Sequence, residues 1–325
     1  MACAIGVLGF SGTAPMTRAV VKEAGPWAAS FGRIVVAAAV VLAVEGVAAL
    51  ARRLRSPRVT PCSRPRWRAS ERVQLVLIAS CVAVAFPWLH AQATVERQAY
   101  ELTLLAGLLP FLTGGLGRLR SGAPTPRRVW LGMFLGSAAI AGFALSRSTS
   151  VAAGRGFGLG LLAMVAAAVG YSESAILTRR FGAWTVISRA VLVALAFDLA
   201  LAAVLRPAWP APHVWRRPLV LVGISYLGVV SMLFASMAWY RGLARAGVTR
   251  GAVVQLAQTP LGLVWSALWL GEPLGPASWA TGALVLLSLW LALGRGGPAP
   301  VPRRAPGVLP SQDGPLAAPG AAEVV

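Results

Sequence analysis

Long apolar stretches recur along the chain, and they constrain its fold more than any other feature. Stretches of about 18 to 24 predominantly apolar residues alternate with short polar segments. Each stretch can cross about 30 Å of hydrocarbon as a helix. Only 12% of the 325 residues are charged, about half the share found in a water-soluble domain. The sequence therefore predicts an all-α integral membrane protein.

Glycine, proline and charged junctions divide these stretches into ten predicted transmembrane helices. The first stretch has no basic segment before it, which favours a retained helix over a cleaved signal peptide. Residues 296–325 are rich in Pro, Gly and Ala without periodicity, and they predict a disordered cytoplasmic tail. The predicted helices are 2–21, 27–50, 73–95, 99–117, 129–146, 157–178, 184–205, 218–240, 251–271 and 277–294.

The basic residues predict the orientation of the chain. The formal net charge is +20, and the arginines lie mostly between apolar stretches rather than in a stripe interleaved with exposed aromatics. Membrane lipids are therefore the expected anionic partners, and no nucleic acid is expected. With a cytoplasmic N-terminus, about twenty basic residues fall in inner segments and about seven in outer ones, as the positive-inside rule requires. We expect a multi-pass protein of the cytoplasmic membrane with both termini in the cytoplasm.

An internal repeat divides the predicted helices into two groups of five. The segment GFSGTAPMTR at 9–18 aligns without gaps on GYSESAILTR at 170–179. A tryptophan and then an arginine follow each copy, Pro110 corresponds to Pro260, and a Trp-Gly pair recurs in the fifth helix of each group. The predicted halves are 1–147 and 157–295. Because five is odd, the second half should enter the membrane inverted, a geometry that provides alternating access in secondary transporters.

The segment QLAQTPLGLVWSALWLGEPLGPASWATGALVLLSLWLAL at 255–293, within this ten-helix arrangement, resembles EamA-type members of the drug/metabolite transporter superfamily. The similarity is strongest in the second half, where Leu270-Gly271-Glu272 follows a proline-centred helix. The first half lacks that acidic residue. The resemblance covers about 2–295 and implies a secondary transporter of a small metabolite or drug, and it places Glu272 in a loop as a helix cap.

Charged residues within predicted spans are functional candidates, because an unpaired charge in the membrane is costly. Arg33 and Arg189 are related by the repeat, and they could clamp an anionic substrate or serve helix packing. Glu173 and Asp198 are the deepest acids, and each could couple transport to protons or form a structural ion pair. We expect Glu173 to pair with Arg189, which would make Arg189 structural. Gly12 replaces Glu173 in the first half, so Arg33 would remain available to a substrate.

Polar and aromatic side chains suggest a cavity wall. Gln255 and Gln258 share one face of the ninth predicted helix, beside a kink expected at Pro260 and matched by Pro110 in the first half. The same polar groups could instead hold helices together without a ligand. Tyr171 could stack on a substrate, as could His90, Trp239 and Tyr240, although aromatics also anchor helices at the membrane interface.

The residues favour a transporter over an enzyme. The sequence has only two histidines and lacks the HExxH, GxSxG and P-loop patterns. Its three scattered cysteines form no CxxC pair, so neither a metal site nor a disulfide is expected, and no cofactor is implied. A small-molecule substrate is the expected partner, and the oligomeric state is left open. A non-transporting membrane scaffold or assembly protein is the alternative, since structural charge pairs alone would produce a similar sequence.

Overall fold

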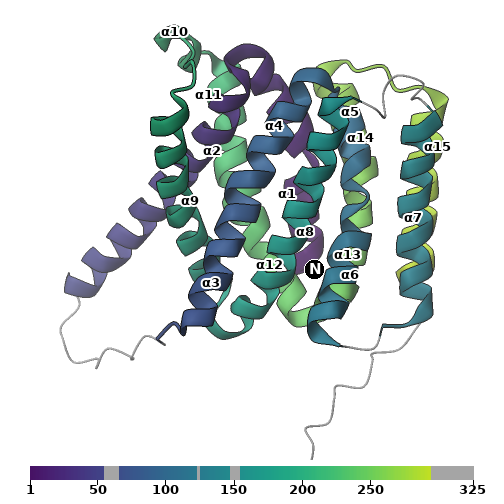
Figure 1. Cartoon of the computed structure of the whole chain (residues 1–325), viewed down its shortest axis with the longest axis horizontal. Coiled ribbons are helices and arrows are strands. Elements are labelled where there is room, and N and C mark those ends of the chain that lie inside the picture. Colours follow the sequence, from purple (N-terminus) through teal and green to yellow (C-terminus); the bar gives the residue numbers. More distant parts are fainter. Residues whose placement is uncertain (55–65, 123–124, 147–153, 294–325) are drawn as a thin grey trace, which may run out of the picture. The chain divides into compact units, whose positions relative to one another are not determined.

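All regular elements are helical in the part of the chain that the computed structural model describes, namely residues 1–54, 66–122, 125–146 and 154–293 (Figure 1). Seven helical runs in it are long and apolar enough to cross a membrane. The prediction of an all-α membrane protein is confirmed at this level. The tail predicted for 296–325 lies outside the described residues. The seven runs are Ala2–Arg52, Ala69–Glu96, Ala99–Arg120, Arg155–Phe181, Ala183–Leu205, Pro218–Ala246 and Val248–Leu270.

Most runs are divided into shorter helices by local changes in hydrogen bonding. In the first part of the chain these are α1 (Ala2–Ser11), α2 (Thr13–Leu54), α3 (Ala69–Ile78), the π-helix η1 (Ala79–Ala85), α4 (Phe86–Glu96), α5 (Ala99–Ala106), α6 (Leu109–Ser121) and α7 (Arg127–Ser146). They are followed by α8 (Arg155–Phe181), α9 (Ala183–Leu205), α10 (Pro212–Trp215), α11 (Pro218–Ser225), the π-helix η2 (Tyr226–Ala235), α12 (Ser236–Ala246), α13 (Val248–Val253), the 3₁₀-helix η3 (Val254–Ala257), α14 (Gln258–Leu270) and α15 (Pro276–Leu293).

The chain turns sharply within α2, at Gly25. Its φ of 82° and ψ of 166° are non-helical, and Pro26 follows directly. Glycine adopts this backbone without a Cβ penalty, and proline supplies no N–H to continue the helical ladder. Figure 1 shows the chain reversing its direction here. The reversal falls between the predicted helices 2–21 and 27–50.

Glycines bring some helices into backbone contact. A Cβ on Gly228 of η2 would lie 2.7 Å from the carbonyl oxygen of Arg33, and one on Gly242 of α12 would lie 2.7 Å from the backbone nitrogen of Cys3. Such close approach is typical of helix packing in membranes, where small residues replace hydrophobic interdigitation. The helices α7 and α15 pack against each other at one edge (Figure 1).

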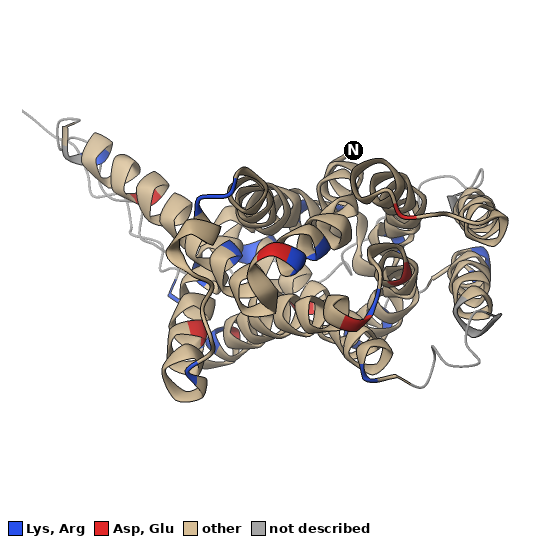
Figure 2. Cartoon of the chain, turned by 90° about the horizontal axis from the view of Figure 1, so that it is seen from above, with Lys and Arg blue, Asp and Glu red and all other residues tan. Residues whose placement is uncertain are grey.

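The exterior is apolar, as lipid contact requires. Large aliphatic and aromatic side chains are exposed on many helices, including Leu42, Phe134, Leu162 and Trp290. Seen from above, most of each ribbon carries no charge (Figure 2). Because most of the helices are apolar on all sides, their inward faces are distinguished by small residues and a few buried polar side chains rather than by hydrophobicity.

Candidate functional site

A small cavity lies inside the bundle, and side chains from seven helices, many of them polar or aromatic, surround it. Its volume is about 20 Å³, little more than one water molecule requires. A ligand larger than water must therefore displace side chains to enter in this conformation. The lining residues are Phe10, Ser11, Thr13, Ala14, Phe86, His90, Leu102, Thr103, Ala106, Leu109, Met164, Tyr171 and Gln258.

Helix interruptions border this cavity. Ser11 and Thr13 flank the break between α1 and α2, and Phe86 follows the π-helix η1 directly. Ala106 and Leu109 flank the break between α5 and α6, and Gln258 follows the 3₁₀-helix η3. Irregular backbone at membrane depth frees hydrogen-bonding groups, and it is tolerated where it lines a cavity. The backbone therefore marks this cavity as a place where polar groups are gathered.

The two prolines expected at kinks lie beside two of these interruptions. Pro110 lies in the first turn of α6, directly after the break that follows Ala106. Pro260 lies in the first turn of α14, directly after η3. Proline is well tolerated at the start of a helix because the first N–H groups there have no intrahelical acceptor.

Tyr171 lies at the centre of an aromatic cluster beside the cavity. Its ring centroid is 5.9 Å from that of Phe10, 5.9 Å from Trp239 and 6.4 Å from Tyr240. Trp239 and Tyr240 are completely buried. These three predicted aromatics therefore belong to the interior and do not anchor the helices at the interface. His90, the fourth, lines the cavity and lies 5.4 Å from Phe86 between ring centroids.

Arg33 reaches the cavity through a hydroxyl group. It is 4% exposed, and its Nη2 donates a hydrogen bond of 3.3 Å to Ser231 Oγ on η2. Ser231 is also hydrogen-bonded at 2.8 Å to Thr13, which lines the cavity. Within the described residues no carboxylate lies within ion-pair distance of Arg33. Its Nε has no partner there either. The buried guanidinium group of Arg33 is therefore connected to the cavity wall through the hydroxyl group of Ser231.

Further polar atoms near the cavity lack a hydrogen-bond partner within the described residues. Among the lining residues these are Thr103 Oγ1 and Gln258 Oε1. Thr259 Oγ1 and both side-chain heteroatoms of Gln255 are also buried without a partner, although neither residue lines the cavity. Gln255 lies within the 3₁₀-helix η3 and Gln258 begins α14, and only Gln258 lines the cavity. Unsatisfied buried groups of this kind are expected where a ligand supplies the missing partner.

The expected ion pair between Glu173 and Arg189 is wrong. Glu173 of α8 pairs with Arg120 of α6 through two contacts, Nε to Oε1 at 2.7 Å and Nη2 to Oε2 at 2.9 Å. Arg189 of α9 approaches Glu45 of α2 at 3.6 Å. The rotation of α8 and α9 about their axes directs the two side chains to different neighbours. That rotation could not be inferred from helices that are apolar all round.

In the first half the position equivalent to Glu173 is Gly12, and the space beside it has no room for a longer side chain. A Cβ on Gly12 would lie 2.5 Å from the hydroxyl oxygen of Tyr226. That hydroxyl donates a 3.0 Å hydrogen bond to the carbonyl oxygen of Gly9. The side chain of Tyr226 therefore fills the space that a longer residue would need. In the first half, a tyrosine from η2 thus takes the place of the side chain that Glu173 has in the second half.

Two other acids behave differently from Glu173. Asp198 of α9 is 8% exposed, and no hydrogen bond or ion pair links it to another described residue. Glu272 follows α14 and accepts hydrogen bonds of 3.0 Å from the backbone N–H groups of Ala99 and Tyr100, at the start of α5. It also lies 3.2 Å from Arg18 Nε. The expectation that Glu272 caps a helix is confirmed.

Sequence reasoning missed several residues of this neighbourhood. Ser231 and Thr13 connect Arg33 to the cavity wall, and Tyr226 lies against Gly12. Serine and threonine are common in membrane helices and carry no distinctive spacing. Thr13 lies inside the repeated segment 9–18, which was the one available signal. Among the described residues no group of three His, Cys, Asp or Glu side chains could hold a metal ion.

Comparison with known proteins gives a consistent result. The EamA-like transporter family matches residues 154–294. The chain is 33% identical over 285 residues to the uncharacterized transporter YdeK of Bacillus subtilis (strain 168), and the alignment covers 87% of this chain and 92% of that protein. A chain of known crystal structure shares the fold with a TM-score of 0.64 and 20% identity, over 90% of this chain and 95% of the other.

Proposed function

This chain belongs to the EamA-like transporter family, and from that membership we propose that it carries a small metabolite or drug bearing an anionic group across the cytoplasmic membrane by alternating access. It is a membrane transporter of the drug/metabolite type. The substrate class, the mechanism and the site residues are the proposal. Arg33 is the observation that carries it.

We propose ten membrane crossings. The run Ala2–Arg52 has 51 residues, which would extend about 75 Å as one straight helix at 1.5 Å per residue, more than twice the hydrocarbon thickness. The turn at Gly25 supports two crossings there. The helices α7 and α15 are apolar and long enough to add one crossing each.

Several paired irregularities support an internal repeat with halves at 1–147 and 157–295. Gly25 and Gly182 have φ of 82° and 80°, and each precedes the second helix of its half. Gly122 and Gly271 have φ of 62° and 61°, and each ends the helix that begins near Pro110 or Pro260. The π-helices η1 and η2 fall in the third helix of each half. Five helices per half would make the repeat inverted, and exchange of the two half conformations would open the cavity to one side at a time.

An anionic substrate follows from the environment of Arg33. A guanidinium group buried in a membrane is costly unless it is paired. The described residues offer Arg33 one hydroxyl and no carboxylate. A substrate carboxylate or phosphate would supply the missing charge. Gln258 and Thr103 would bind polar groups of the same ligand, and the rings of Phe10 and Tyr171 would pack against its apolar part.

Among the acidic residues we assign proton coupling to Asp198. Glu173 is held by Arg120 in a two-point ion pair, so its charge is balanced in this conformation. Asp198 is buried, and the described residues give it no cationic partner. Arg189 is a structural partner of Glu45 in this scheme and takes no part in coupling. Asp198→Asn should abolish uptake driven by a pH gradient while substrate exchange between equal pH continues.

Uptake or efflux by purified protein in liposomes tests the transport proposal. Radiolabelled small organic anions should accumulate when a pH gradient is imposed, and neutral analogues should not. Transport of cations alone would remove the role of Arg33. No transport of any small molecule by folded, correctly inserted protein would favour a scaffold. Reporters at the C-terminus, active only outside the cytoplasm, should stay inactive if both termini are cytoplasmic.

A further inference from the structure

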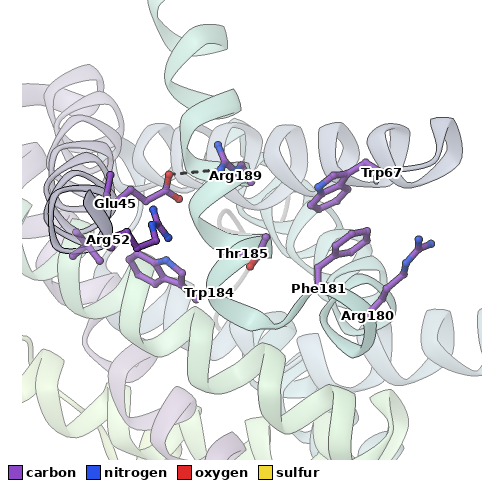
Figure 3. A pocket seen from close by; sticks show the side chains of 11 residues that line it. Glu45, Arg52, Trp67, Arg180, Phe181, Trp184, Thr185 and Arg189 are labelled. Carbon is purple, nitrogen blue, oxygen red and sulfur yellow. Dashed lines mark ion pairs between the residues drawn. The ribbon is translucent and has the colours of Figure 1, made fainter. Parts of the chain in front are cut away.

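A second, much larger pocket lies at one end of the bundle, between the C-terminal part of α2 and the junction of α8 and α9. Its volume is about 840 Å³. The charged side chains of Glu45, Arg52 and Arg189 gather at one end of it, while Trp67 and Phe181 stack at the other (Figure 3). The centroids of these two rings are 3.8 Å apart and their planes are almost parallel, at 2°. The pocket is therefore both charged and aromatic.

The charges in this pocket leave an excess of one cation. Arg189 approaches Glu45 at 3.6 Å, and both side chains are more than a third exposed, so this pair is loose. Arg52 is exposed and forms no ion pair with any described residue. Arg180 also lines the pocket, but it is paired with Glu71. Arg52 and Arg189 together can therefore receive one singly charged anion while Glu45 stays in place.

The side chains around the pocket are of the kinds that contact a membrane lipid. From Leu42 onward most residues of α2 are exposed, and Val44, Ala48 and Ala49 form an apolar wall of the pocket. Trp67 and Trp184 line it beside arginines, a combination typical of the interface between headgroups and acyl chains. Basic pockets between helix ends on the arginine-rich side of a membrane protein are suited to phospholipid headgroups.

We propose that this pocket binds the phosphodiester of an anionic phospholipid. Arg52 and Arg189 hold the phosphate, the stacked Trp67 and Phe181 and the ring of Trp184 enclose the glycerol region, and the acyl chains follow the exposed apolar face of α2. A zwitterionic lipid would leave the excess positive charge unbalanced and should bind more weakly. The proposal is independent of which substrate is transported, because the pocket shares no lining residue with the central cavity.

Native mass spectrometry of the detergent-solubilised full chain, titrated with dioleoyl phosphatidylglycerol, tests the proposal. Arg52→Ala should weaken binding about fivefold, since one arginine near a lipid surface contributes about 1 kcal/mol. Arg52→Ala with Arg189→Ala should weaken it about twentyfold or more. Arg52→Lys should retain most of the affinity. Arg250→Ala is the matched control, because Arg250 is exposed and does not line the pocket.

Folding is controlled separately, because Arg52 has no described ion pair to lose and Arg52→Ala should elute as a single species at wild-type yield. Unchanged binding by Arg52→Ala, or equal losses in Arg52→Ala and Arg250→Ala, would overturn the site. Equal binding of dioleoyl phosphatidylethanolamine would overturn the anionic assignment. Displacement of the lipid by glycerol phosphate or inorganic phosphate at equal concentration would mean that the pocket takes a free phosphorylated solute.

Discussion

Arg33 is buried without a carboxylate partner in the described chain, so its removal should affect binding more than folding. We expect Arg33→Ala to insert and purify at a near-normal level, because no acidic group is left uncompensated. Uptake of an anionic substrate should fall by about ten- to a hundredfold in kcat/KM, the loss of a charged hydrogen bond of about 1.5–3 kcal/mol. Arg33→Lys should recover part of it. The measurement is uptake into liposomes at matched protein content.

Arg189 is the control for Arg33, because the repeat relates the two positions. Its pair with Glu45 is loose and partly exposed, and such pairs contribute under about 1 kcal/mol. Arg189→Ala should therefore leave both the folded yield and the transport of the substrate near wild type. A loss of folded protein in Arg33→Ala equal to the loss of transport would contradict the binding role of Arg33.

The pair formed by Glu173 and Arg120 is asymmetric in burial, and the two single variants should differ for that reason. The side chain of Glu173 is 8% exposed and that of Arg120 is 51% exposed. Arg120→Ala leaves a buried carboxylate and should destabilise the protein by about 1–3 kcal/mol or more. Glu173→Gln leaves an arginine that can turn to water and should cost less. In thermal unfolding, Glu173→Gln should partly restore the melting temperature of Arg120→Ala.

At the scale of elements, Gly228 sets the distance between η2 and α2 and thereby the contact of Arg33 with Ser231. A Cβ there would lie 2.7 Å from the carbonyl oxygen of Arg33. Gly228→Ala should destabilise the fold by about 1–3 kcal/mol and weaken substrate binding, because the two helices must separate. Gly46→Ala, with no neighbouring atom within 4 Å, is the control and should not destabilise the fold. Equal melting temperatures for the two variants would show that η2 can shift away from α2 without cost, and would contradict the role of Gly228.

The helices themselves were predictable, and their interruptions and rotations were not. Every range predicted from its apolar length contains helical residues. In lipid, a single segment can pair all its backbone N–H and C=O groups only as a helix. Tyr171 and Gln258 both line the central cavity, and their role in binding a substrate stays a prediction. The break at Gly12 and the 3₁₀-helix η3, in contrast, depend on packing against other helices. The same packing brings Glu173 to Arg120, and a uniformly hydrophobic sequence pattern does not predict which helix faces meet.

At the scale of the whole molecule, charged contacts join helices near both ends of the bundle, and we expect these contacts to act as two closures of the central cavity. At one end Glu272 binds Arg18 and the first N–H groups of α5. At the other end Glu173 joins α8 to α6 through Arg120. The repeat does not relate the two closures to each other. Gly12 is the first-half residue that aligns with Glu173, and the first half has no counterpart of Glu272. Alternating access would require them to open one at a time.

This arrangement predicts opposite effects on access to the cavity. A variant with Thr103→Cys, in a background where Cys3, Cys62 and Cys81 are replaced, reports access through labelling by a membrane-impermeant maleimide. Glu272→Gln should increase labelling from the side on which α5 begins, because the carboxylate no longer holds Arg18 or caps α5 with a full charge. Arg120→Ala should increase labelling only from the opposite side, since α6 is released from α8. Increased labelling from the same side in both variants would contradict two separate closures, and unchanged labelling in both would mean that packing alone holds the cavity shut.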